Sequence, residues 1–327
     1  MDIPVVWFAV VAFFWVGYLV LEGFDFGVGM LSPFVGRTDG QRQAVLRTIG
    51  PVWDGNEVWL VVAVGLPFAV FPQWYAALFS AFYLPALAVL VALVGRGVAL
   101  EFRGKRDDVR WHRRCDAAVA VGSFVPAVVW GAVLGTLVQG LPVDARGTYA
   151  GGPVVVDGWP GLSGAVALLG LCAFHGAVFL ALRTTGVLQV RALRTARLAG
   201  PVAVVAVVAF LAYVQLARGD VVSAVTGVGA VLAVAAALVA VWRRRDGWAF
   251  AGTALGIALT VVTVFVALFP AVVPSTLDPG WTLTVESTVA SPYALRTMTV
   301  VAGILLPFVL AYQGWSYWVF RRRVVAP

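Results

Sequence analysis

The sequence predicts an all-α integral membrane protein with nine transmembrane helices. Three observations support this class: 61% of the 327 residues are hydrophobic, only 12% are charged, and the apolar residues form long segments divided by short basic clusters. A soluble domain of this size carries roughly twice as much charge, so the composition excludes one. The net charge of +7 does not indicate nucleic-acid binding, because the basic residues lie in separate short segments and not on one soluble surface.

The first apolar segment is expected to be an uncleaved membrane span. No basic region precedes it, no small-residue cleavage site follows it, and it continues to Met30, further than the core of a signal peptide. A membrane-spanning helix needs about 20 apolar residues. Division of the chain at charged or Pro/Gly-rich breaks gives nine candidate spans in a single polytopic domain, 1–327: residues 5–33, 51–71, 74–98, 116–138, 159–182, 198–216, 221–242, 248–272 and 292–320.

Two pairs of these spans are joined by very short turns. The second and third spans are separated by Phe71-Pro72-Gln73-Trp74, and the sixth and seventh by Arg218-Gly219-Asp220. Loops this short make the helices on either side antiparallel neighbours. Merging either pair into one helix would reverse the orientation of every later span.

Basic residues follow every second span, as expected for short cytoplasmic loops. The opposite loops hold only Arg146 and Arg218. This alternation predicts an N-terminus outside the cell and a C-terminus in the cytoplasm. The clusters after the first, third, fifth, seventh and ninth spans are Arg37, Arg42 and Arg47; Arg103, Lys105, Arg106, Arg110, Arg113 and Arg114; Arg183, Arg191, Arg194 and Arg197; Arg243, Arg244 and Arg245; and Arg321, Arg322 and Arg323.

Four carboxylic acids interrupt the first two apolar segments. Glu22 and Asp25 lie in LVLEGFDFGVGML, and Asp54 and Glu57 lie in GPVWDGNEVWL. A charged side chain inside a bilayer is costly, so such residues normally face protein and mark ion or proton paths. Residues three apart share one face of a helix. Each pair can therefore line one path.

The predicted topology brings these acids to the level of Arg96. Asp25 lies about 30 Å along the first span, in its cytoplasmic half, and Asp54 and Glu57 lie about 5 and 9 Å inside the cytoplasmic end of the second. Arg96 is near the cytoplasmic end of the third span. We expect Asp25 and Asp54 to transfer protons, with Arg96 favouring the ionised form of the acid it meets. The alternative is a static hydrogen-bonded network that fixes helix register. For Glu22 and Glu57 the sequence does not favour proton transfer over such a network.

Other candidate sites are few. Gly23 and Gly27 form a GxxxG pattern that can let a neighbouring helix approach closely and shelter the acids. His175 is the only histidine inside a predicted span, and a lone histidine cannot bind haem on both faces, so we expect a packing or quinone-side role. Cys115 and Cys172 lack CxxC spacing, so neither a disulfide nor a metal cluster is predicted.

Four long segments carry a family resemblance. They are EGFDFGVGML at residues 22–31, RTIGPVWDGNEVWLVVAVGLPFAVFPQWYAALFSAFYLP at 47–85, GSFVPAVVWGAVLGTLVQG at 122–140, and FPAVVPSTLDPGWTLTVESTVASPYALRTMTVVAGILLPFVLAYQGWSYWVFRRR near the C-terminus. These segments resemble subunit II of the cytochrome bd type quinol oxidases, and the resemblance covers almost the whole chain.

The resemblance implies two four-helix bundles and one peripheral helix, paired with a similarly folded subunit I. Subunit I would carry the b-type haems, the d-type haem and the quinol site, so this chain would ligate no haem and no metal, although subunit II can hold a structural quinone. A small single-helix subunit can also be attached. The complex would oxidise quinol, reduce O2 to water and build a proton gradient across the bacterial cytoplasmic (inner) membrane.

By the same resemblance, Asp25, Asp54, Arg96 and Asp116 belong to a proton route toward subunit I. We expect Asp116 and Glu101 to lie near its entrance. Some relatives have neutral residues at the positions of Glu22 and Glu57, which argues against an essential role for these two acids throughout the family.

Two other functions remain open. A secondary transporter could use the same acids for proton coupling, although the helices show no matched pair of broken segments and no clear inverted repeat. A scaffold subunit would contain the same polar residues without transferring protons. Purification separates a transporter from an oxidase subunit, which would bring haem absorbance with its partner, and carboxylate variants separate a scaffold from a proton route.

Overall fold

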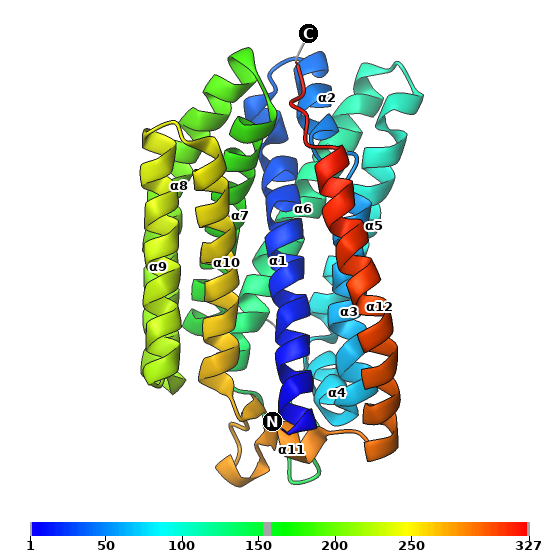
Figure 1. Cartoon of the computed structure of the whole chain (residues 1–327), viewed down its shortest axis with the longest axis vertical. Helices are drawn as coiled ribbons and strands as arrows, with labels where there is room; N and C mark the ends of the chain where they lie inside the picture. The colour runs from blue at the N-terminus through cyan, green and yellow to red at the C-terminus, as the bar shows by residue number, and fades with distance from the viewer. Residues whose placement is uncertain (1, 153–157, 326–327) are drawn as a thin grey trace.

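Long apolar helices run side by side along the long axis of the molecule (Figure 1). The computed structural model describes residues 2–152 and 158–325. In this part of the chain, eight helices are long and apolar enough to cross a membrane, and the predicted all-α class is confirmed. The two termini lie at opposite ends of the molecule (Figure 1). We name these ends after the short helices found there: the α2 end (α2, Asp39–Arg47), near the C-terminus, and the α11 end (α11, Val285–Thr288), near the N-terminus.

The long helices form two groups and one peripheral element. The first group contains α1 (Ile3–Val35), α3 (Trp53–Val70), α5 (Tyr83–Phe102) and α6 (Val109–Gln139). The second contains α7 (Gly158–Arg183), α8 (Gly186–Arg218), α9 (Val221–Trp242) and α10 (Asp246–Leu268). Helices α1 and α6 pack against α7 and so join the groups. The last helix, α12 (Pro292–Val319), lies beside α3 and has a single buried residue, Leu295.

The second and third predicted spans differ most from the observed helices. The span predicted at residues 51–71 contains α3 (Trp53–Val70), which is not among the eight because Asp54, Asn56 and Glu57 occupy its first turns. Residues 74–98 do not form one helix: α4 (Pro72–Ala81) ends before Phe82, and α5 begins after it at Tyr83. Pro85 explains the break, because proline cannot donate a hydrogen bond to the carbonyl four residues earlier and its ring clashes with that carbonyl.

Helices α6 and α8 are longer than the spans predicted at residues 116–138 and 198–216. At the α2 end both continue as helix through predicted loop segments, which carry half of one basic cluster in α6 and most of another in α8. Arginine is a good helix former, so a basic segment that leaves an apolar span need not end the helix. The short turn η1 (Arg103–Lys105) connects α5 to the segment before α6.

Side-chain caps stabilise the connections between helices. Thr38 accepts a hydrogen bond from the Gln41 N–H at the start of α2, and Asp220 and Ser223 form a capping box at the start of α9. At the α11 end, β1 (Ala271–Val273) pairs antiparallel with β2 (Leu283–Thr284) around the turn η2 (Pro279–Trp281). These elements close that end of the helix groups (Figure 1).

The backbones of α1 and α7 are in direct contact at one position. A Cβ on Gly27 would overlap the carbonyl oxygen of Cys172 and lie 2.7 Å from Gly176 Cα. A Cβ on Gly23 would lie 3.4 Å from the flexible end of Ile257, which is an ordinary contact. The close approach expected from the GxxxG pattern is therefore made by its second glycine.

Candidate functional site

A buried ion pair joins α1 to α5. Arg96 Nη1 donates to Glu22 Oε2 at 2.7 Å, and both side chains are fully buried. The guanidinium of Arg96 also lies over the ring of Phe26, 5.2 Å from its centre. Gly122 of α6 allows this packing, since a Cβ there would be 2.6 Å from Arg96 Cβ.

Glu57 of α3 lies at the edge of this pair. Its Oε1 is 4.0 Å from Arg96 Nη1, and its side chain is 23% exposed. Arg96 therefore faces two carboxyl groups from two different helices. One guanidinium compensates one carboxylate, so this arrangement can hold an exchangeable proton.

Asp25 is bound by an amide and not by a cation. Asn56 Nδ2 donates to Asp25 Oδ2 at 2.7 Å, and both residues are fully buried. Asn56 Oδ1 in turn accepts hydrogen bonds from Gln313 Nε2 at 3.1 Å and from the Tyr317 hydroxyl at 2.7 Å. Sequence reasoning missed Asn56, although the signal was present: it is an amide between two acids in an otherwise apolar segment, and a buried polar group needs partners.

Asp54 does not join the buried cluster. Its side chain is exposed on α3, and it makes no side-chain hydrogen bond or ion pair with the residues that the structure describes. Val58 and Val61 share this outward face, with 52% and 69% of their surface exposed. The structure thus brings together Glu22, Asp25, Glu57 and Arg96 and leaves Asp54 on the surface of this chain.

Some buried polar atoms of the cluster have no hydrogen-bond partner among the described residues. They belong to both charged partners and to the neighbouring acid: Glu22 Oε1, Asp25 Oδ1, and Arg96 Nε and Nη2. More than nine in ten buried polar groups in proteins are hydrogen-bonded to protein or to ordered water. Internal water can satisfy such groups where they converge, and it is also what proton transfer between side chains needs.

A second charged cluster, which we call the α2 clamp, lies at the α2 end. Asp116 binds Arg42 Nε at 2.8 Å and Arg103 Nε at 2.7 Å. Arg103 also reaches Asp39 at 2.7 Å, and His112 Nδ1 is 3.1 Å from the second oxygen of Asp39. Partial burial raises the pKa of Asp39, but Arg103, His112 and Arg42 outweigh it and hold that pKa below its usual value. The α2 clamp connects α2, η1 and α6.

Both carboxylate oxygens of Asp116 are therefore bound to guanidinium groups. Asp116 thus connects structural elements, in addition to lying near the α2 end. Glu101, the other residue expected there, is exposed and lines a groove of about 310 Å³ together with Arg47, Trp53 and Lys105. The groove and the α2 clamp share Arg103. Both predicted entrance residues thus lie at the same end of the molecule.

We expect Asp116→Asn to loosen the α2 clamp. The substitution removes the charge that holds Arg42 and Arg103, and a hydrogen bond to a charged partner contributes about 2 kcal/mol. Thermal unfolding of the detergent-solubilised complex measures this loss, with Asp107→Asn, at an exposed aspartate, as control. Because the pKa of Asp39 is lowered, its contribution to the clamp is present above about pH 4 and is lost only as the pH falls below that value. Equal thermal stability of the two variants at neutral pH would show that the α2 clamp does not stabilise the complex.

His175 is held by three helices. Its Nε2 is 3.2 Å from the carbonyl oxygen of Val20, which can only accept, so Nε2 carries the proton and Nδ1 accepts from the Thr253 hydroxyl at 2.6 Å. The ring stacks on Phe250 with 4.7 Å between ring centres. Both nitrogens are occupied, which agrees with a packing role. The described residues contain no group of three or more His, Cys, Asp or Glu side chains that could bind a metal.

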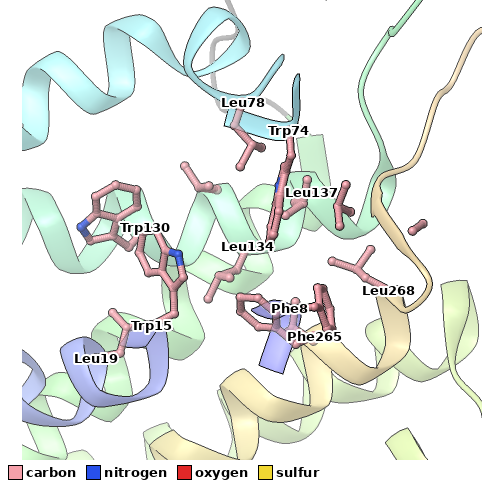
Figure 2. A pocket seen from close by; sticks show the side chains of 14 residues that line it. Phe8, Trp15, Leu19, Trp74, Leu78, Trp130, Leu134, Leu137, Phe265 and Leu268 are labelled. Atoms are coloured by element: carbon pink, nitrogen blue, oxygen red, sulfur yellow. The ribbon is translucent and has the colours of Figure 1, made fainter. Parts of the chain in front are cut away.

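An apolar cavity of about 50 Å³ lies between α1, α4, α6 and α10 toward the α11 end. Figure 2 shows Trp74 and Phe8 on one side of it and Trp15 and Trp130 on the other. Trp74 Nε1 is buried without a hydrogen-bond partner among the described residues. An apolar cavity known to bind benzene has a volume of about 150 Å³, and a quinone ring is larger than benzene. The quinone that the family resemblance implies therefore does not fit this cavity.

Comparison with known proteins identifies close relatives. A sequence model described as cytochrome bd terminal oxidase subunit II matches residues 3–320. The chain is 42% identical over 325 residues to cytochrome bd ubiquinol oxidase subunit 2 of Bacillus subtilis, covering 97% of this chain and 96% of that protein. It is 33% identical over 357 residues to cytochrome bd-I ubiquinol oxidase subunit 2 of Escherichia coli K12, covering 98% and 94%.

The fold also occurs among solved structures. A chain of the bd oxidase from Geobacillus thermodenitrificans superposes with a TM-score of 0.76 and 20% sequence identity, over 98% of this chain and 99% of that one. At this identity the likeness is one of fold.

Proposed function

Because this chain belongs to the cytochrome bd terminal oxidase subunit II family, we propose that it supplies part of a cytoplasmic proton path to a haem-bearing subunit I. Its relatives are subunits of cytochrome bd ubiquinol oxidase, so the chain is a subunit of a respiratory quinol oxidase and a multi-pass bacterial membrane protein. The complex would oxidise quinol, reduce O2 to water and energise the cytoplasmic membrane. We assign the α2 end to the cytoplasm, because the basic clusters gather there.

We propose that the haems b and d and the quinol site all belong to subunit I. One observation on this chain supports that division: His175, the only histidine within a predicted span, uses both ring nitrogens for protein contacts. When bound in subunit I, the haems supply the electron transfer and O2 chemistry. The cavity in Figure 2 is too small for a quinone ring and is not proposed as its site.

Subunit I is proposed to cover the outward face of α3. Asp54 is exposed on this face within the predicted membrane span, and contact with lipid would leave its carboxylate without solvation. A protein partner removes that cost and gives Asp54 a position at the subunit boundary. Helix α12, with one buried residue, lies next to this face and presents further surface that a partner can bury.

The observation that carries the proton path is the number of acids around Arg96. Glu22 and Glu57 both lie within 4.0 Å of its guanidinium, and Asp25 is buried three residues from Glu22 without a cation of its own. Proton transfer needs groups of unequal proton affinity in one connected place, and these acids have different partners. In the proposed order, protons enter at the α2 end, pass the acids around Arg96, and leave through Asp54 toward subunit I.

Asp25→Asn in the assembled oxidase tests the proposal. Asparagine keeps the shape of the side chain but cannot exchange the proton, so quinol-driven O2 consumption should fall by about 100-fold. Asp54→Asn should act in the same direction, and proteoliposomes should lose acidification together with O2 consumption. Asp107→Asn, an exposed aspartate at the α2 end, is the matched control.

Haem absorbance of each purified variant reports whether the subunits have assembled. Full O2 consumption and full membrane energisation in both Asp25→Asn and Asp54→Asn would remove the proton role and leave this chain as a scaffold. A chain that purifies without haem absorbance and moves a substrate by itself would instead support the transporter.

A further inference from the structure

Asn56 stands between the peripheral helix and the buried acid on α1. It is fully buried on α3, with Asp25 on one side of its amide and two side chains of α12 on the other. Those two side chains, Gln313 and Tyr317, are half-buried and four residues apart, so they share the face of α12 that meets α3. The Tyr317 ring also contacts Phe24 edge-on, with 6.4 Å between ring centres.

The orientation of the Asn56 amide follows from its neighbours. Its Nδ2 lies 3.4 Å from the carbonyl oxygen of Leu21, a group that can only accept hydrogen bonds. The NH2 group therefore points toward α1, where Asp25 Oδ2 is its second acceptor. The amide oxygen then faces α12 and receives two donors, the Gln313 amide and the Tyr317 hydroxyl. A flipped amide would lose the donors to α1 and oppose the Gln313 NH2 group.

This orientation decides which oxygen of Asp25 can carry a proton. Oδ2 already accepts the Asn56 N–H at 2.7 Å, and a protonated carboxyl group accepts hydrogen bonds better through its carbonyl oxygen than through its hydroxyl oxygen. Oδ1 is buried and has no hydrogen-bond partner among the described residues. A proton on Asp25 therefore sits on Oδ1 and leaves from it.

We propose that Gln313 and Tyr317 are positioning residues that hold Asn56 so that Asp25 exchanges its proton only through Oδ1. This inference rests on the proposed proton role of Asp25. Neither α12 side chain makes a hydrogen bond to Asp25, and both bind the Asn56 amide that does. Any partner that covers α12 would act on Asp25 by the same connection.

The double variant Tyr317→Phe with Gln313→Leu tests the inference in the assembled oxidase. It removes both donors to the Asn56 oxygen and leaves Asn56 and Asp25 in place. Without them the amide can rotate away, and the loss of one hydrogen bond to the acid should slow O2 consumption by about tenfold. Tyr312→Phe, at an exposed tyrosine one turn earlier on α12, is the matched control and should leave the rate unchanged.

Infrared difference spectroscopy supplies a readout that a merely structural role would not move. The C=O band of protonated Asp25 is recognised by its loss in Asp25→Asn. In the double variant and in Asn56→Leu this band should shift to higher frequency, because the carbonyl oxygen Oδ2 no longer accepts a hydrogen bond. Tyr317→Phe alone is the milder variant if the double variant assembles poorly, and it should shift the band in the same direction.

The outcomes separate the inference from the function beneath it. If Asp25→Asn is inactive but the band and the rate are unchanged in the double variant, in Tyr317→Phe and in Asn56→Leu, the positioning role is overturned and the proton path stands. If Asp25→Asn is fully active, the proton path itself fails. A shifted band with a slowed rate supports the proposal.

Discussion

Arg96→Met is expected to prevent accumulation of the assembled oxidase. The substitution leaves Glu22 fully buried without its cation, and removal of one partner from a buried ion pair costs about 3–5 kcal/mol. Native proteins are stable by only about 5–15 kcal/mol, so most of the complex should be lost from the membrane. The haem absorbance of membranes from cells that express the variant measures this loss.

The double variant Arg96→Met with Glu22→Leu should restore assembly, because apolar residues of similar size often replace a buried ion pair at little cost. Its O2 consumption should remain low, since the proposed proton path has lost its guanidinium and one acid. Arg110→Met, at an exposed arginine of the α2 end, is the control for loss of a positive charge. Normal assembly of the single Arg96→Met variant would show that Glu22 does not depend on Arg96 for its charge.

Gly27→Ala should strongly destabilise the contact between the two helix groups, whereas Gly23→Ala should be tolerated. The new methyl group at Gly27 would overlap backbone atoms of α7, which cannot move aside like a side chain, so α1 and α7 must separate. Overpacking of this kind costs about 3 kcal/mol. At Gly23 the nearest atom is the flexible end of Ile257 at 3.4 Å.

The two variants add the same methyl group at the two glycines of one GxxxG pattern, four residues apart, so they form a matched pair. Thermal unfolding of the purified complex compares them, and the variant at Gly27 should unfold at a clearly lower temperature. Equal stability would mean that α1 and α7 do not approach as closely in the complex as they do in this chain.

The candidate site was predictable in part. The depth of Glu22, Asp25, Glu57 and Arg96 follows from the rise of a helix along the chain, and the structure brings these residues together. The rotation of α3 about its axis was not predictable. Its first turns carry polar residues on several sides, so hydropathy does not indicate which side packs against a neighbouring helix. That rotation buries Asn56 and turns Asp54 outward.

Two features of the fold show the same limit. The break between α4 and α5 was signalled by Pro85, but a proline can bend a helix or end it, and the choice depends on what packs nearby. The α2 clamp joins Arg42, Arg103 and Asp116 across three elements. Each of these residues appeared in the sequence only as part of a basic cluster or as a candidate acid.

The sequence by itself determined the membrane class, the apolar segments, the alternation of basic clusters and the family, because hydropathy, charge and motif are properties of contiguous residues. The tertiary structure decided that Glu22 pairs with Arg96, that Asn56 binds Asp25, and that Asp54 faces outward. These outcomes depend on the rotation and spacing of helices that are distant in the chain. A small change in how closely two helices approach, or in the rotation of one helix about its axis, would change these contacts without any change in the local sequence pattern.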